Sequence, residues 1–205
     1  MQDVTVNDAS DAEVWSRLVA GQADLFSVIY GRHAESVYGY CFRRTGSWSA
    51  AEDLTSIVFL EAWRRRADIR FGDEGSLRPW LFGVANNAIR NRARAVRRHR
   101  AALQRLPAAM VADDATVEVD RRLDDEAKMR RVLAVLEQLS PHHQEVLALT
   151  VWAGLDLAGA AVALGVPVGT VKSRLSRARA ALAALASPPT DAAPVAGTRP
   201  EGANR

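Results

Sequence analysis

One segment of the sequence, from Ala50 to about Ala67, carries apolar residues all around a helix instead of along one side. At about 100 degrees per residue, these side chains spread over nearly the whole circumference. They are Leu54, Ile57, Val58, Phe59, Leu60 and Trp63. A helix of this kind must bury more than one face. Either it lies at the centre of a bundle, or it packs on its own domain with one face and on a partner protein with another.

The helix predicted from Pro79 to about Arg100 has an apolar side and a polar side. The apolar side consists of Leu81, Val84, Ala85 and Ala88. The opposite side gathers side chains that can contact base edges and phosphates, namely Asn86, Asn87, Arg90, Asn91 and Arg94. Seven arginines and no acidic residue occur from Arg90 to Arg105. This pattern favours binding to a nucleic acid.

Three aromatic residues near the start of this helix offer flat surfaces on which unpaired bases can stack. Phe71 lies in the predicted loop from Ala67 to Arg78, and Trp80 and Phe82 lie in the first turns of the helix. Each aromatic residue alone is more often a core residue, and for Trp80 we favour the core.

The segment from Gly165 to Arg179 predicts a turn followed by a basic helix. Val171, Leu175, Ala178 and Leu182 fall on one apolar stripe, and Lys172, Ser173, Ser176 and Arg177 point away from it. No acidic residue occurs between Leu157 and Thr190, so nothing local opposes a polyanion. Taken alone, the same pattern fits a solvated surface helix equally well. A short helix from Leu157 to Leu164 precedes the turn and completes a helix-turn-helix.

The rest of the chain is also helical in pattern, without strand alternation, a glycine-rich phosphate loop or an internal repeat. Ser10 or Asp11 is expected to cap a first helix, and Ser140-Pro141 starts a later one. The sequence therefore predicts an all-α protein with two small helical domains joined by a flexible linker, the second with a helix-turn-helix. The expected parts are a disordered N-terminus (1–10), a first domain (11–100), a linker (101–124), a second domain (125–186) and a disordered tail (187–205).

Charge and composition narrow the function classes. The net charge is +3 and the pI about 9.5, and the only lysines are Lys128 and Lys172, so the cationic surfaces are mostly arginine. A coding bias toward arginine would explain the whole-chain count equally well. The predicted linker is acidic, which indicates a solvated spacer, with transient covering of the basic surfaces as the alternative.

Cys41 is the only cysteine, so an intramolecular disulfide is excluded and a cytoplasmic location is expected. The histidines and Cys41 show no metal-ligand spacing, and His33 is expected to be a packed or capping residue. We expect no metal, no cofactor and no enzymatic activity, because no catalytic carboxylate pair or activated nucleophile is present. The sequence has no signal peptide and no segment long enough for membrane insertion.

Three motifs together resemble a bacterial RNA polymerase sigma factor of the short, two-domain extracytoplasmic-function (ECF) group. The segment AEDLTSIVFLEAWR from Ala51 resembles the helix that binds core polymerase. The segment RPWLFGVANNAIRNR from Arg78 is similar to the helix that meets the promoter's minus-ten element. Leu139-Ser-Pro and the segment from Gly165 to Arg179 resemble the domain that reads the minus-thirty-five element. The resemblance covers about residues 11–185.

This resemblance implies a factor that binds core RNA polymerase, recognises the promoter and helps to melt it. The polymerase-binding residues would be Asp53, Leu54, Ile57, Val58, Phe59, Glu61 and Trp63, covered by the coiled coil of the largest subunit. The minus-ten and melting residues would be Phe71, Trp80, Asn86, Asn87, Arg90, Asn91, Arg94, Arg97 and Arg98. The upstream-element residues would be Thr170, Lys172, Ser173, Arg174, Ser176 and Arg177. The loop from Ala67 to Arg78 would capture an unstacked base of the non-template strand.

The chain departs from the family pattern at three places. Ile57 replaces an acid at the polymerase face, Ala158 and Gly159 replace glutamates of the short helix, and Pro167 replaces a capping serine. The resemblance also implies promoter DNA and an anti-sigma factor as partners, and a monomer when free. The alternatives are a stand-alone helix-turn-helix regulator, which would dimerise, and an adaptor that binds an anti-sigma factor without starting transcription.

Overall fold

The computed structural model describes residues 8–72, 75–103 and 120–186, and among these there are helices and no strands. The first domain contains α2 (Asp11–Val19), the 3-10 turn η1 (Ala23–Leu25), α3 (Phe26–Thr45), α4 (Trp48–Arg64) and α5 (Arg78–Leu103). The second contains α6 (Asp120–Leu136), α7 (Pro141–Leu147), the π-helical turn η2 (Ala148–Trp152), α8 (Leu157–Leu164) and α9 (Val168–Ala186). The predicted all-α class is confirmed.

Local sequence signals set several helix ends. Ser10 forms a capping box with Glu13 at the start of α2, and the Ser140 side chain caps α7 just before Pro141. Asp156 caps α8 by accepting a hydrogen bond from the Gly159 amide at 2.7 Å. Gly165 ends α8 in the left-handed conformation, with a φ of 65 degrees, as a helix C-cap often requires.

Helix α6 begins within the segment that the sequence predicts to be a linker. Helix α6 starts at Asp120, so residues 120–124, which we assigned to the linker, are helical. The acidic run did not show this because charge favours a solvated segment whether it is coil or the exposed surface of a helix. Residues 104–119 of the predicted linker, residues 1–7 of the predicted disordered N-terminus and the whole predicted tail (187–205) lie outside the described residues.

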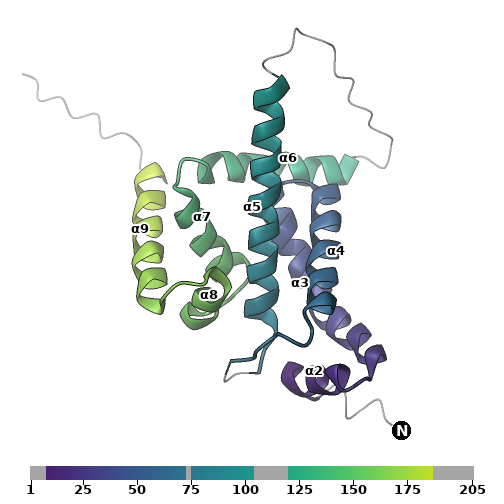
Figure 1. Ribbon diagram of the computed structural model, residues 1–205. Helices are drawn as coiled ribbons and strands as arrows, with labels where there is room; N and C mark the ends of the chain where they lie inside the picture. Colours follow the sequence, from purple (N-terminus) through teal and green to yellow (C-terminus); the bar gives the residue numbers. More distant parts are fainter. Residues whose placement is uncertain (1–7, 73–74, 104–119, 187–205) are drawn as a thin grey trace, which may run out of the picture.

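Helix α5 is the central element of the molecule (Figure 1). Its first half packs against α3 and α4 on one side and against α8 of the second domain on the other. The buried side chains of both domains form a single continuous core, which includes Tyr40, Phe82, Leu149 and Val171. The two domains are therefore docked on each other in this structure.

The docking depends on small residues where α5 crosses α8. A Cβ placed on Gly83 of α5 would lie 3.0 Å from the Ala163 carbonyl oxygen, and one on Gly159 of α8 would lie 3.4 Å from Pro79 Cγ. The two helix backbones approach closely because these glycines lack side chains. At the edge of the crossing, the Arg78 guanidinium donates to the Ala153 carbonyl at 2.5 Å.

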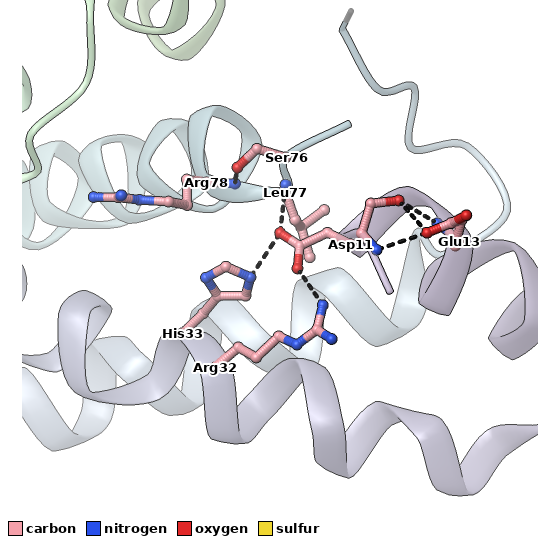
Figure 2. Close-up of polar contacts among 8 residues, drawn as sticks. Asp11, Glu13, Arg32, His33, Ser76, Leu77 and Arg78 are labelled. Carbon is pink, nitrogen blue, oxygen red and sulfur yellow. Dashed lines mark hydrogen bonds and ion pairs between the residues drawn. The ribbon is translucent and has the colours of Figure 1, made fainter. Parts of the chain in front are cut away.

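A buried carboxylate connects three segments of the first domain (Figure 2). Asp11 accepts hydrogen bonds from His33 Nε2 at 2.8 Å, the Leu77 amide at 2.9 Å and Arg32 Nη1 at 3.1 Å. Burial raises the pKa of the Asp11 carboxyl, but the bonds from His33, Leu77 and Arg32 outweigh it and lower the pKa to about 2. His33 is thus the packed residue that the sequence predicts.

We expect Asp11 to make the stability of the protein sensitive to acid. Its pKa of about 2 lies below the ordinary value of 3.8, so its contribution is complete above pH 4 and is lost as the pH falls toward 2. Relative to Asp11→Asn, the free energy of unfolding of the wild type should fall by about 2 kcal/mol between pH 5 and pH 2. Urea unfolding at four pH values measures this difference, and parallel curves for the two proteins would contradict it.

Candidate nucleic-acid interface

The six residues predicted to read the upstream element lie together on α9. Val171, Leu175 and Ala178 are buried beneath them, as the periodicity predicts. Lys172, Ser173, Ser176 and Arg177 are exposed, and Thr170 and Arg174 are half-buried. No carboxylate occurs in α9, so this face carries only hydroxyl and cationic groups. The arrangement can donate hydrogen bonds to base edges and phosphates in a groove.

A second basic surface lies on α5, whose C-terminal half extends beyond the rest of the bundle (Figure 1). Asn87, Asn91, Arg94, Arg97 and Arg98 are exposed along it. Arg94 donates to the Asn91 side-chain oxygen at 2.5 Å, which aligns an amide with a guanidinium. These groups match the amide and arginine chemistry that recognises bases and phosphates.

Two residues that we predicted on the same polar side are not available to contact DNA in this structure. Asn86 is only 1% exposed, since it lies on the side of α5 that packs in the core, and the prediction that it faces solvent is wrong for this structure. Arg90 forms a two-pronged ion pair with Glu145 of α7, which is 3% exposed. The hydrogen bond to Glu145 raises the pKa of Arg90. The second domain therefore covers part of the surface that we predicted to meet DNA.

Of the three aromatic residues considered for base stacking, Phe82 is buried in the core, and Phe71 and Trp80 are partly buried. Phe71 packs edge-on against Trp15 with ring centroids 6.4 Å apart. Trp80, which we assigned to the core, packs against it but also lines a cavity of about 280 Å³ beside the loop between α4 and α5. Gly159 and Val162 of α8 form the opposite wall of this cavity.

The apolar helix α4 does not lie at the centre of the bundle. Leu54, Val58 and Phe59 are buried in the core of their own domain, so they are not exposed in this structure and their contact with a partner stays a prediction. Ile57 and Leu60, in contrast, are 49% and 54% exposed. The helix thus packs on its own domain with one face and presents another to solvent.

We define the α4 outer face as Asp53, Ile57, Leu60 and Glu61, which share one side of the helix at spacings of three and four. Glu61 forms an ion pair with Arg65 at 2.5 Å. Trp63 lies beside this face, half-buried, with the Arg66 guanidinium 4.5 Å from its ring centroid. Leu60 was missing from our predicted partner residues, although its spacing of three from Ile57 is the signal that places it there.

The remaining groups to consider are Cys41 and possible metal ligands. Burial raises the pKa of the Cys41 thiol to about 12, so this free cysteine is an unreactive core residue. In the part of the chain that the structure describes, no three histidine, cysteine or acidic residues are grouped to hold a metal. Within the same residues, every helix is too short or too polar to cross a bilayer.

Fold and surfaces together indicate a helical DNA-binding protein of transcription, with two exposed basic helices and an exposed apolar face on α4. Family models agree: Sigma-70 region 2 matches residues 29–100, and Sigma-70, region 4 matches residues 129–182. The chain belongs to the ECF RNA polymerase sigma factors. Sigma factors of this family are non-catalytic transcription initiation factors. A stand-alone helix-turn-helix regulator is not favoured, because region 2 accompanies the helix-turn-helix.

Several relatives support this assignment. The chain is similar to the ECF RNA polymerase sigma factor SigL of Mycobacterium tuberculosis, with 33% identity over 82% of this chain and 92% of the relative. It is 35% identical to SigC of the same species over 68% of this chain and 71% of the relative. Its fold is similar to CnrH, solved in complex with the cytosolic domain of CnrY, with a TM-score of 0.63 and 24% identity over 86% of this chain and 97% of that one.

A second solved structure has the same fold. It is RpoE of Bartonella quintana in complex with the anti-sigma factor NepR, with a TM-score of 0.56 and 23% identity over 78% of this chain and 95% of that one.

The docked arrangement of the domains gives a direct prediction. Gly83→Leu should separate them, because its side chain would meet the Ala163 backbone, and overpacking of this kind costs about 1–3 kcal/mol that separation relieves. We expect a larger radius of gyration by small-angle X-ray scattering. Gly31→Leu is the matched control, because the space around Gly31 in α3 is open. An unchanged radius for Gly83→Leu would show that α5 and α8 do not dock closely in solution.

Proposed function

We propose that the protein binds core RNA polymerase through the α4 outer face and recognises the promoter at two points, the minus-ten element with α5 and the minus-thirty-five element with α9. The observation that carries this proposal is the presence in one chain of two exposed basic helices, one in each matched sigma region. Neither helix alone distinguishes a sigma factor from another DNA-binding protein.

The α4 outer face supports the polymerase contact. Ile57 and Leu60 expose apolar surface that the rest of the first domain leaves uncovered. Asp53 and Glu61 flank them with carboxylates, which suits an interface with an apolar centre and a polar rim. The partner we propose is the coiled coil of the largest polymerase subunit. Ile57, where the family often has an acid, makes this contact more apolar.

Recognition of the minus-ten element combines α5 with the loop before it. The exposed Asn87, Asn91 and Arg94 supply base-edge and phosphate contacts, and Arg97 and Arg98 extend the cationic surface. The loop and Trp80 border a cavity that α8 closes on the opposite side. Once α8 has moved away, the loop and Trp80 capture an unstacked base of the non-template strand, which helps to melt the promoter.

The docked domains explain why the factor depends on polymerase. Arg90 is paired with Glu145, and α8 forms one wall of the cavity beside Trp80. Promoter binding at two points therefore requires the domains to separate. Polymerase holds them apart at a fixed spacing, which raises the effective concentration of each weak DNA contact.

The factor acts in the cytoplasm, where it meets polymerase and DNA, and it is a monomer when free. An anti-sigma factor is a partner, which the complexes of CnrH with CnrY and of RpoE with NepR support. The proposal requires no cofactor.

Run-off transcription with core polymerase on a pool of randomised promoters tests the function. We expect selection of two short elements with a fixed spacing. We also expect the isolated protein to bind a selected promoter at least about tenfold more weakly than the holoenzyme, because only the holoenzyme gains the effective concentration. Failure to start transcription from any promoter would contradict the proposal, as would tight sequence-specific binding by the isolated protein in a gel-shift assay.

The two basic helices should be separable by substitution. Ser173→Ala and Arg177→Ala should each weaken recognition of the upstream element by about 1–3 kcal/mol, while Asn87→Ala should reduce permanganate reactivity of the melted region. Arg17→Ala is the control, because Arg17 is an exposed arginine on α2 that donates to Gln22 at 3.0 Å. Normal promoter opening with Asn87→Ala would contradict the role of α5.

A further inference from the structure

Helix α2 lies outside the segment that matches sigma region 2, which begins at residue 29. It nevertheless contacts the loop between α4 and α5, whose described residues are 65–72 and 75–77. This loop is the one to which the proposed function assigns base capture. The contacts of α2 lie at both ends of the loop.

The end of the loop is held by the first turn of α2. Asp11 accepts the hydrogen bond of the Leu77 amide at 2.9 Å, one residue before α5 begins (Figure 2). The adjacent Ala12 amide donates to the Gly75 carbonyl at 3.0 Å. The first amides of a helix have no partner within the helix, so α2 has this donor free for the loop.

Asp11 is itself held in place from α3. His33 Nε2 lies 2.8 Å from one of its carboxylate oxygens, and Arg32 donates to the other at 3.1 Å. Asp11 and His33 are buried, so these bonds are protected from competition with water. The carboxylate therefore fixes the position of Leu77 relative to α3, which is part of the rigid core.

The start and middle of the loop contact a second residue of α2. The Trp15 indole nitrogen donates to the Arg66 carbonyl at 2.9 Å, two residues after α4 ends. The same ring packs edge-on against Phe71 at 6.4 Å. Trp15 is buried, so it forms a fixed surface for this part of the loop.

The loop has a second side, which faces the cavity next to Trp80. Gly72, Gly75 and Ser76 line this cavity, while Gly75 is also the residue that bonds to Ala12. The Gly75 backbone, which borders the cavity, is thus held in place by its hydrogen bond to α2. Trp80 follows three residues after Leu77, so its place also depends on where α5 starts.

We propose that α2 positions the base-capturing loop and that Asp11 is the positioning residue, acting through Leu77 and the start of α5 without touching DNA. This inference rests on the proposed function of the loop. It gives α2, which lies outside the segment that matches Sigma-70 region 2, a role in recognition of the minus-ten element.

The test compares holoenzymes that contain the wild type, Asp11→Asn or Glu13→Gln. Glu13→Gln is the matched control, because Glu13 lies on the same helix and its carboxylate accepts hydrogen bonds from the exposed cap residue Ser10. The probe is a single-stranded oligonucleotide with the non-template minus-ten strand of a promoter that the wild-type holoenzyme selects. We expect Asp11→Asn to weaken its binding about tenfold, the effect of losing one hydrogen bond to a charged group. Affinity for core polymerase and for upstream-element duplex should change less than about twofold.

Hydrogen exchange of the free proteins gives an independent measurement. In Asp11→Asn, exchange of the Leu77 amide should become faster, and exchange in α4 should stay as in the wild type. Unchanged oligonucleotide binding would overturn the inference. An equal loss of all three affinities would overturn it too, because it would show a general effect on folding. If the wild-type holoenzyme does not prefer the selected strand over a scrambled one, the proposed function fails and the inference fails with it.

Discussion

The structure depends on the burial of α5 from two sides, by helices of the first domain on one side and by α8 of the second domain on the other. Leu81, Phe82, Ala85 and Ile89 are buried, and this helix has packing partners in both domains. Once α3, α4 and α8 have covered its first half, only part of the polar side and the C-terminal half remain in solvent, and those carry Asn87, Asn91 and the exposed arginines. The basic surface on α5 is therefore the part of the helix that the core does not use.

Electrostatics makes the docked arrangement specific. Burial of Glu145 is costly unless a cation satisfies both carboxylate oxygens, and Arg90 does so from the other domain. The same guanidinium is part of the surface we propose for the promoter. One side chain thus has two competing anionic partners, a carboxylate within the chain and a nucleic acid outside it, and it can satisfy only one at a time.

Much of the fold follows from local sequence signals. Ser140-Pro141 and Gly165 mark helix ends through capping and backbone geometry that involve only neighbouring residues. The exposed basic face of α9 could be predicted because its apolar stripe is narrow. Helix α4 shows the limit: its apolar residues surround it, so periodicity cannot tell which of them a partner would meet. The pairing of Arg90 with Glu145 depends on a contact between the domains, of which the local sequence carries no sign.

The crossing of α5 and α8 also determines how the protein responds to ionic strength. It consists of glycine backbone and small apolar side chains around Gly83 and Ala163, and such contacts carry no net charge for ions to screen. Phosphate contacts of exposed arginines, in contrast, weaken steeply as salt rises, and the largely buried pair of Arg90 and Glu145 is screened less than they are. Added salt therefore weakens the contacts with DNA more than the contacts between the domains, and it shifts a mixture of protein and DNA toward the docked, unbound protein.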